Sequence, residues 1–269
     1  MKLVSIGEAT ADFYPQHQQT YVGGISLNFA VHAKRCGADF VSLVSCVGDD
    51  AHGQMILSRL DQEHINRSHV TVHSGKTAYC EIVILENGER YFPPNSYHQH
   101  VLATYEPSPV DLNFIQQHDI LVSRFDISYT KATFDHVMKQ MPFAGKRVAD
   151  FGDWYDYAGR EAQILPYLPH IDLAFVSGEP ETINYFLPHS HGKTQWVITL
   201  GAEGSVALQN GKVIQQTAVS VPQIIDTTGC GDAFQAAFTV NYFQTSTLAQ
   251  ALNAGANHAT QTLTHLGAI

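Results

Sequence analysis

The amino-acid sequence predicts an α/β fold in which a mostly parallel central sheet is flanked by helices. Short apolar runs rich in β-branched residues alternate with segments of helical pattern, which is typical of a sheet covered on both faces. A chain of 269 residues with 44% hydrophobic content can bury one large core. Because the chain contains no internal repeat and no low-complexity linker, we expect a single domain over residues 1–269.

The first strand and helix open this alternation. Residues 2–7 are a short apolar run, and residues 27–36 show a helical pattern. Ser26 stands where a helix N-cap is expected, and Gly37 follows the last helical residue. The same alternation continues to the C-terminus. Further strands are predicted at 40–46, 120–123, 147–151, 173–177 and 196–200, and further helices at 53–63, 130–141, 231–243 and 248–263.

Two predicted hairpins interrupt this alternation of strands and helices. In "TAYCEIVILENGERYF", residues 77–92, two strand-like runs flank Asn87-Gly88, a strong turn signal, and Asn210-Gly211 marks a second hairpin. We expect residues 77–92 to pair with the extended residues 12–22 and to form a small β lid at the sheet end that carries the glycine motifs. The alternative is an edge hairpin without function.

Composition excludes several classes of partner. The formal charge is −10 and no Lys/Arg-rich run occurs, so we expect no nucleic-acid or membrane partner. The first residues lack the pattern of a signal peptide, and no apolar run is long enough to span a bilayer. Four cysteines without C-x-x-C pairing indicate reduced thiols. A cytoplasmic protein is therefore expected.

Familiar cofactor and metal motifs are missing. Neither a P-loop nor a G-x-G-x-x-G fingerprint is present. Asp150-Phe151-Gly152 spells a protein-kinase triplet but has no accompanying catalytic loop; Asp150 nonetheless ends a predicted strand, where ligands of open α/β sheets bind. The histidine pairs at 98/100 and 189/191 lie beside Pro and other loop residues, and we expect solvated loops there rather than metal sites.

The stretch "IIDTTGCGDAF", residues 224–234, contains the candidate catalytic residues. If a helix begins near Gly231, the N–H groups of Gly229, Cys230 and Gly231 point from its positive end toward an anion. Asp232 in the first turn is then placed to accept a proton from an attacking hydroxyl, while the amides stabilise a transferred phosphoryl group. The alternative is an ordinary helix N-terminus with an acid in its first turn.

Two further glycine stretches support the functional interpretation. "YVGGISLNFAVHAKRCG" places Gly23-Gly24 before a helix and Asn28 in its first turn, where a small polar ligand meets backbone and amide together. "VITLGAEGSVAL" is a strand ending at Thr199, followed by Gly201 and Gly204, where a nucleotide can lie across the backbone.

In this order and spacing, the stretches resemble the ribokinase-like sugar kinases of the PfkB family. That family pairs two glycines with an asparagine four residues on, matched by Gly24 and Asn28, and ends in D-T-x-G-A-G-D-x-F, matched by residues 226–234. Residues 47–53 and 264–268 also match family stretches, so the resemblance covers the whole chain. It implies a ribokinase-like fold with a β lid.

The resemblance also implies roles for individual residues. Asp232 becomes the base, and Gly229, Cys230 and Gly231 form the anion hole. The other assignments fall into two groups: Asp12, Gly23, Gly24 and Asn28 for the sugar, and Thr199, Gly201 and Gly204 for ATP. The resemblance further implies Mg²⁺ and a homodimer through the lid, and it leaves a monovalent cation open.

Two positions depart from the family pattern. Cys230 replaces the usual alanine and puts a thiol at a helix N-terminus, where the thiolate and its oxidation are favoured. The N-x-x-E sequence after a central strand is replaced by Ser177-Gly178-Glu179-Pro180-Glu181. The expected magnesium ligand is therefore Glu181, acting through water.

Within the family, "FYP" after Asp12 and "ADFGDWYD" at 149–156 are most similar to the kinases of fructoselysine and related fructosamines. Such a substrate carries a cation, for which four acids are candidates: Asp12, Glu81, Asp153 and Asp156. A fructokinase or another sugar or nucleoside kinase is the alternative. A non-catalytic sugar or nucleotide sensor is a third possibility, against which the intact Asp232 argues.

Overall fold

The computed structural model describes residues 1–125, 131–157 and 161–269. Its largest element is a nine-stranded sheet with the order β15-β14-β13-β12-β11-β10-β1-β4-β5. All neighbours are parallel except β13–β14 and β14–β15, which are antiparallel. The bounds are β1 Lys2–Ile6, β4 Phe40–Gly48, β5 Asn66–His73, β10 Ile120–Arg124, β11 Lys146–Asp153, β12 Leu173–Ser177, β13 Gln195–Thr199, β14 Ser205–Gln209 and β15 Lys212–Gln216.

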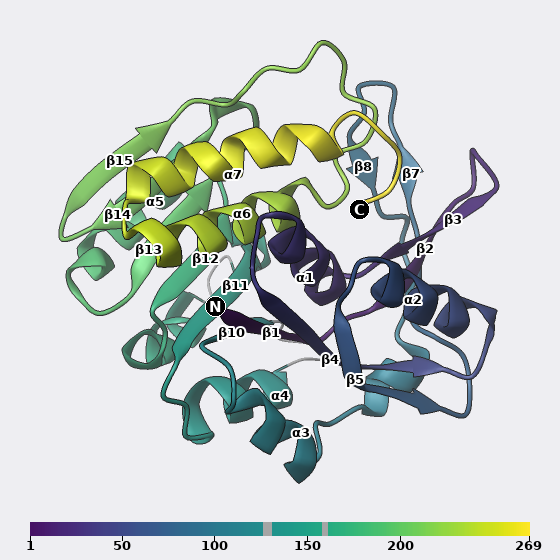
Figure 1. Cartoon of the computed structure of the whole chain (residues 1–269). Coiled ribbons are helices and arrows are strands. Elements are labelled where there is room, and N and C mark those ends of the chain that lie inside the picture. Colours follow the sequence, from purple (N-terminus) through teal and green to yellow (C-terminus); the bar gives the residue numbers. More distant parts are fainter. Residues whose placement is uncertain (126–130, 158–160) are drawn as a thin grey trace.

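Helices cover both faces of this sheet. Figure 1 shows α1, α6 and α7 together on one side, with α3 and α4 at the other. The helices are α1 Ile25–Arg35, α2 Ala51–Gln62, α3 Pro109–Ile115, α4 Lys131–Asp135, α5 Pro180–Phe186, α6 Cys230–Thr245 and α7 Leu248–Thr262. A π-helical turn, His136–Gln140, continues α4.

The apolar core lies in two layers, one on each sheet face. Successive strand residues point to opposite faces, so Leu3 packs with the layer under α1, α6 and α7 and Val4 with the opposite layer. In the same way, Phe175 packs with the layer under α1, α6 and α7, and Val176 packs with the opposite layer. This double burial explains the continuous apolar runs.

A smaller sheet lies beside the main one. Its order is β3-β2-β6-β9, with β2 Thr10–Tyr14, β3 Gln19–Gly23, β6 Tyr79–Glu81 and β9 Tyr97–His98. The pairing of β2 with β6 joins the two segments expected to associate, although this pair is parallel. Both hairpins are confirmed: β7 Val83–Ile84 with β8 Arg90–Tyr91, and β14 with β15.

The expected cap of α1 is wrong. Its N-cap is Gly24, and the Ser26 hydroxyl donates to Ile6 O instead, at 3.0 Å. The Glu8 carbonyl accepts the Leu27 N–H, so the helix start is satisfied by backbone rather than by a side chain. No helix among residues 1–125, 131–157 and 161–269 is long and apolar enough to cross a membrane.

Candidate active site

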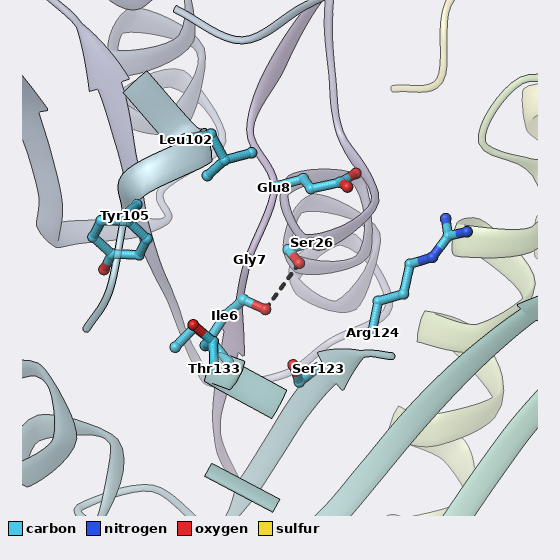
Figure 2. Close-up of a pocket in the computed structure, with 9 residues that line it drawn as sticks. All are labelled: Ile6, Gly7, Glu8, Ser26, Leu102, Tyr105, Ser123, Arg124 and Thr133. Atoms are coloured by element: carbon cyan, nitrogen blue, oxygen red, sulfur yellow. Dashed lines mark hydrogen bonds between the residues drawn. The ribbon is translucent and has the colours of Figure 1, made fainter. Parts of the chain in front are cut away.

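The predicted site residues lie at the carboxyl end of the parallel strands: the catalytic and sugar residues lie near β1 and β10, and the nucleotide residues lie at the end of β13. From β1 and β10 the order proceeds to β4 and β5 on one side and to β11, β12 and β13 on the other. Ligands of open α/β sheets bind at such a reversal. Figure 2 shows a pocket beside β1 and β10, with Glu8 beyond the end of β1 and Arg124 at the end of β10; the predicted site residues are not among those that line it.

Asp232 lies in the first turn of α6, as predicted. The N-cap Gly229 has a left-handed backbone, with φ 74°. The Asn28 Nδ2 donates to Asp232 Oδ2 at 2.8 Å, which joins the start of α1 to the start of α6. Among the described residues, the buried Asn28 Oδ1 has no hydrogen-bond partner. One amide thus holds the carboxylate and offers an acceptor to a hydroxyl.

The electrostatics of Asp232 suit a general base. Removal from water, together with the negative charge of Asp150, raises the pKa of this carboxyl to about 7. The Asn28 hydrogen bond and the positive charges of Arg124 and Arg90 act in the opposite direction. A base with a pKa near neutrality combines a useful ionised fraction with proton affinity.

The amides of the α6 N-terminus are not equivalent. The Cys230 N–H donates to Thr227 O at 3.3 Å. Those of Gly229 and Gly231 donate to no protein acceptor in the described part of the chain. A Cβ at Gly231 would meet nothing within 4 Å, so the backbone there is open to an anion. The anion hole therefore rests mainly on Gly229 and Gly231.

Asp226, fully buried, fixes the loop before α6. Its carboxylate accepts from Thr228 N at 2.7 Å, from Gly267 N at 2.9 Å and from the Tyr14 hydroxyl at 2.8 Å. These bonds link the small sheet and the C-terminal residues to the anion-hole loop.

His32 and His258 form a hydrogen-bonded pair beside the loop that precedes α6. The His32 Nε2 lies 2.8 Å from Ala268 O, which can only accept, so this nitrogen carries the hydrogen. Burial lowers the pKa of His32 to about 4, and its neutral Nδ1 accepts from His258 Nε2 at 3.0 Å. Ala268 in turn packs against Gly229, where a Cβ would lie 2.4 Å from the Ala268 Cβ.

The expectation of a thiolate at Cys230 is wrong. Burial raises the pKa of this thiol, and its sulfur lies 3.8 Å from Ala259 O of α7. The side chain packs against the apolar core under α6 and α7, and this burial outweighs the effect of the positive helix end on the thiol.

The predicted sugar residues lie beside this centre. Asp12 is buried on β2, and its Oδ1 accepts from the Thr10 hydroxyl at 2.7 Å. Burial and the negative charges of Glu8 and Asp226 raise the Asp12 pKa to about 7. The side chain occupies the space that a Cβ at Gly23 would need. Gly24, with φ 98°, lets the start of α1 approach the β1–β2 connection.

The predicted nucleotide residues lie at the end of β13. The Thr199 hydroxyl is 2.8 Å from that of Ser177. Gly201, with φ 57°, borders open space. Gly204 packs against β15, since a Cβ there would lie 2.1 Å from Gln216 O. This contact is structural, and only the backbone of Gly204 is left for a ligand.

The candidate magnesium residue Glu181 is exposed in the first turn of α5. No group of three or more His, Cys, Asp or Glu side chains that could hold a metal occurs among residues 1–125, 131–157 and 161–269. Asp153, a candidate partner for the cation of the substrate, is exposed and accepts a hydrogen bond from the Tyr155 N–H. The side chain of Asp156 lies outside the described residues.

Sequence reasoning missed two arginines of this site. Arg124 ends β10, and its guanidinium packs against Gly152 at the end of β11. Arg90 starts β8 of the hairpin. The position of Arg124 at a strand end was a usable signal, whereas that of Arg90 depends on how the hairpin folds over the loop before α6.

Comparison with protein families gives one match over nearly the whole chain. The model described as "pfkB family carbohydrate kinase" matches residues 2–269. Among curated proteins, the chain is 31% identical to fructoselysine 6-kinase of Escherichia coli over 274 residues, covering 99% of this chain and 98% of that protein. It is 26% identical to fructosamine kinase FrlD of Bacillus subtilis, covering 100% and 93%.

Solved structures share the fold. A probable sugar kinase from Rhizobium etli aligns with a TM-score of 0.86 at 15% identity, covering 99% of this chain and 94% of that chain. Ribokinase of Arabidopsis thaliana complexed with ribose and ATP aligns with a TM-score of 0.77 at 22% identity, covering 99% and 94%.

Proposed function

Because the chain belongs to the pfkB family of carbohydrate kinases and is an ATP-dependent sugar kinase, we propose that its substrate is a fructosamine, phosphorylated at O6. One observation carries the proposal: the chain matches two fructoselysine 6-kinases and a fructosamine kinase over at least 93% of each protein. The ribokinases match over 69 to 84% of their lengths, at 24 to 27% identity.

The reaction uses the residues at the start of α6. Asp232 takes the proton from the sugar O6 hydroxyl as that oxygen attacks the γ-phosphorus of ATP. The bond between the γ-phosphorus and its bridging oxygen breaks, and ADP leaves. The Gly229 and Gly231 amides stabilise the charge on the transferred group. Asp12, Gly24 and Asn28 hold sugar hydroxyls, and Thr199 and Gly201 border the nucleotide.

The charged residues near β1 suit the rest of a fructosamine. Glu8 is buried and lines the same pocket as Arg124. A fructosamine carries an ammonium next to the sugar and a carboxylate on its amino-acid portion. We assign Glu8 to the ammonium, and this buried acid supports a cationic substrate over plain fructose.

Magnesium would accompany the nucleotide. Mg²⁺ in kinases is held by one or two carboxylates together with phosphates and water, so the lack of a three-carboxylate cage in the described residues agrees with this mode. Asp150, at the end of β11, and Glu181, through water, are the residues that would hold it. When bound, the ion neutralises phosphate charge.

Three properties of the working protein complete the proposal. A kinase requires ATP, which supports a cytoplasmic location. A homodimer through the lid is supported by the exposed apolar side chains of Leu85, Tyr91 and Phe92, and sedimentation of the purified protein tests it. Dependence on a monovalent cation is tested by comparing rates in potassium and sodium salts.

A substrate panel tests the proposed function. ADP release is measured with ATP, Mg²⁺ and either fructoselysine, fructosylglycine, fructose or ribose. We expect the highest kcat/KM for a fructosamine, because contacts to the amino-acid portion help to position O6 near Asp232. If fructose or ribose exceeds every fructosamine, the substrate proposal is wrong while the kinase assignment stands.

A further inference from the structure

The hairpin of β7 and β8 is bonded to the loop that leads into the anion hole. The Thr227 N–H donates to Gly88 O at 3.1 Å, and the Arg90 N–H donates to the Thr227 hydroxyl at 3.0 Å. That hydroxyl in turn donates to Glu89 at 3.2 Å. Residues far apart in the sequence thus form one unit at the start of α6.

Close backbone packing reinforces this unit. A Cβ at Gly88 would lie 2.6 Å from the Ile224 Cγ2 and 2.7 Å from the Ile224 carbonyl oxygen. Gly88 also has φ 84°, which an L side chain rarely adopts. The hairpin turn therefore requires glycine at this position, both for the positive φ and for the close packing against Ile224.

Arg90 is the side chain that this packing brings to the site. Its Nη1 donates to Thr227 O at 3.2 Å, which orients the guanidinium over the loop. Its Nε and Nη2 donate to no protein acceptor in the described part of the chain. The residue is exposed, so these donors are accessible to a phosphate.

The charge of Arg90 reaches the residues on both sides of the anion hole. It favours the ionised forms of Cys230 and of Asp232, the residues directly before and directly after Gly231. The neighbouring charges are Arg124 and Asp150 near Asp232 and Glu89 on the hairpin. Arg90 is therefore close enough to the anion hole for its charge to act on the residues that flank Gly231.

We propose that Arg90 binds the phosphoryl group during its transfer and stabilises its charge through Nε and Nη2. Planar guanidinium groups bind phosphate oxygens through two parallel N–H bonds. The inference rests on the proposed function, because it takes Asp232 and the α6 amides as the transfer centre. It adds that the hairpin supplies a group to the chemistry as well as covering the substrate.

The experiment compares Arg90→Gln, Arg90→Lys and Arg90→Ala with the matched control Arg67→Gln. Arg67 is a half-buried arginine of β5, paired with Asp61. Loss of one preorganised donor to a developing charge lowers kcat by about 10²–10³-fold. We expect such a loss for Arg90→Gln, with the KM values of ATP and sugar changed only a few-fold, and wild-type rates for Arg67→Gln.

Chemical rescue separates this role from a purely structural one. Guanidinium at low, non-denaturing concentration should restore part of kcat in Arg90→Ala and none in Asp232→Asn. An unchanged kcat with a raised sugar KM in Arg90→Gln would overturn the proposal, because Arg90 would then only hold the substrate. Wild-type kinetics in Arg90→Gln would also overturn it. If Asp232→Asn is impaired while Arg90→Gln is not, only the Arg90 proposal fails; if Asp232→Asn is fully active, the transfer centre itself is misplaced.

Discussion

Replacing Asn28 with leucine should move the pH profile of the reaction to higher pH. Asn28 Nδ2 donates to the Asp232 carboxylate at 2.8 Å, and this bond favours the ionised form. Leucine has a similar size but no donor, so the pKa of Asp232 rises. Because the base acts when it is deprotonated, the rising limb of kcat/KM follows its pKa.

The size of the shift follows from the hydrogen bond. A hydrogen bond to a charged group contributes about 1.5–3 kcal/mol. Asp232 is only half-buried, so solvent screening reduces the contribution to roughly half. At 1.36 kcal/mol for each pKa unit, the limb should move by about one unit from the wild-type value of about 7.

The assay is ADP release at saturating ATP, measured from about pH 5.5 to about pH 9. Asp150→Asn is the paired variant, since removing its negative charge lowers the pKa of Asp232 and should move the limb to lower pH. Asn257→Leu, on exposed α7 surface, should leave the limb in place. A limb that stays fixed in Asn28→Leu, or shifts in the same direction in both site variants, would refute the assignment of Asp232 as the base.

Three further predictions concern stability and reactivity. The folded-state pKa of Asp12, about 7, exceeds its ordinary value of 3.8. The contribution of the protonated Asp12 to stability is therefore complete below about pH 4 and is lost as the pH rises to about 7. Asp12→Asn should raise Tm at about pH 8 and not at about pH 4, and a calorimetric difference that does not depend on pH would contradict this. Gly231→Val should keep Tm, because its Cβ meets nothing, but raise the KM of ATP and lower kcat, whereas Gly229→Ala should lower Tm through its φ of 74° and its contact with Ala268; equal Tm losses would show that Gly231 is structural. Because burial raises the pKa of the Cys230 thiol, iodoacetamide should react with it slowly near neutral pH and Cys230→Ala should keep kcat; fast inactivation that ATP prevents and Cys230→Ala abolishes would overturn this.

The sequence predicts the central strands well because each is an apolar run buried on both faces. It misses β5, whose residues 66–73 are mostly polar because this strand lies at the sheet edge. It also misses α3 and α5, which have only seven residues each. Helical periodicity needs a longer window than this to be recognised.

The core of the candidate site is also predictable, because Asp232, Gly231 and Asn28 belong to short local motifs. The supporting contacts are not local: Arg90 meets Thr227 across 137 residues, and His32 meets Ala268 across 236. Cys230 shows the same limit, since its position in sequence suggests a reactive thiol while the packing of α6 on α7 buries it.

The position of the phosphate in the product tests the central claim most directly. The product of ATP and fructoselysine is analysed by phosphorus–proton correlation NMR, for the wild type and for Asp232→Asn. We predict phosphorus coupled to the C6 protons, one ADP formed for each sugar phosphate, and kcat lower by about 10²–10⁴-fold in Asp232→Asn with ATP affinity preserved. A phosphate on another hydroxyl, ADP formed without a sugar phosphate, or full turnover by Asp232→Asn would contradict the account.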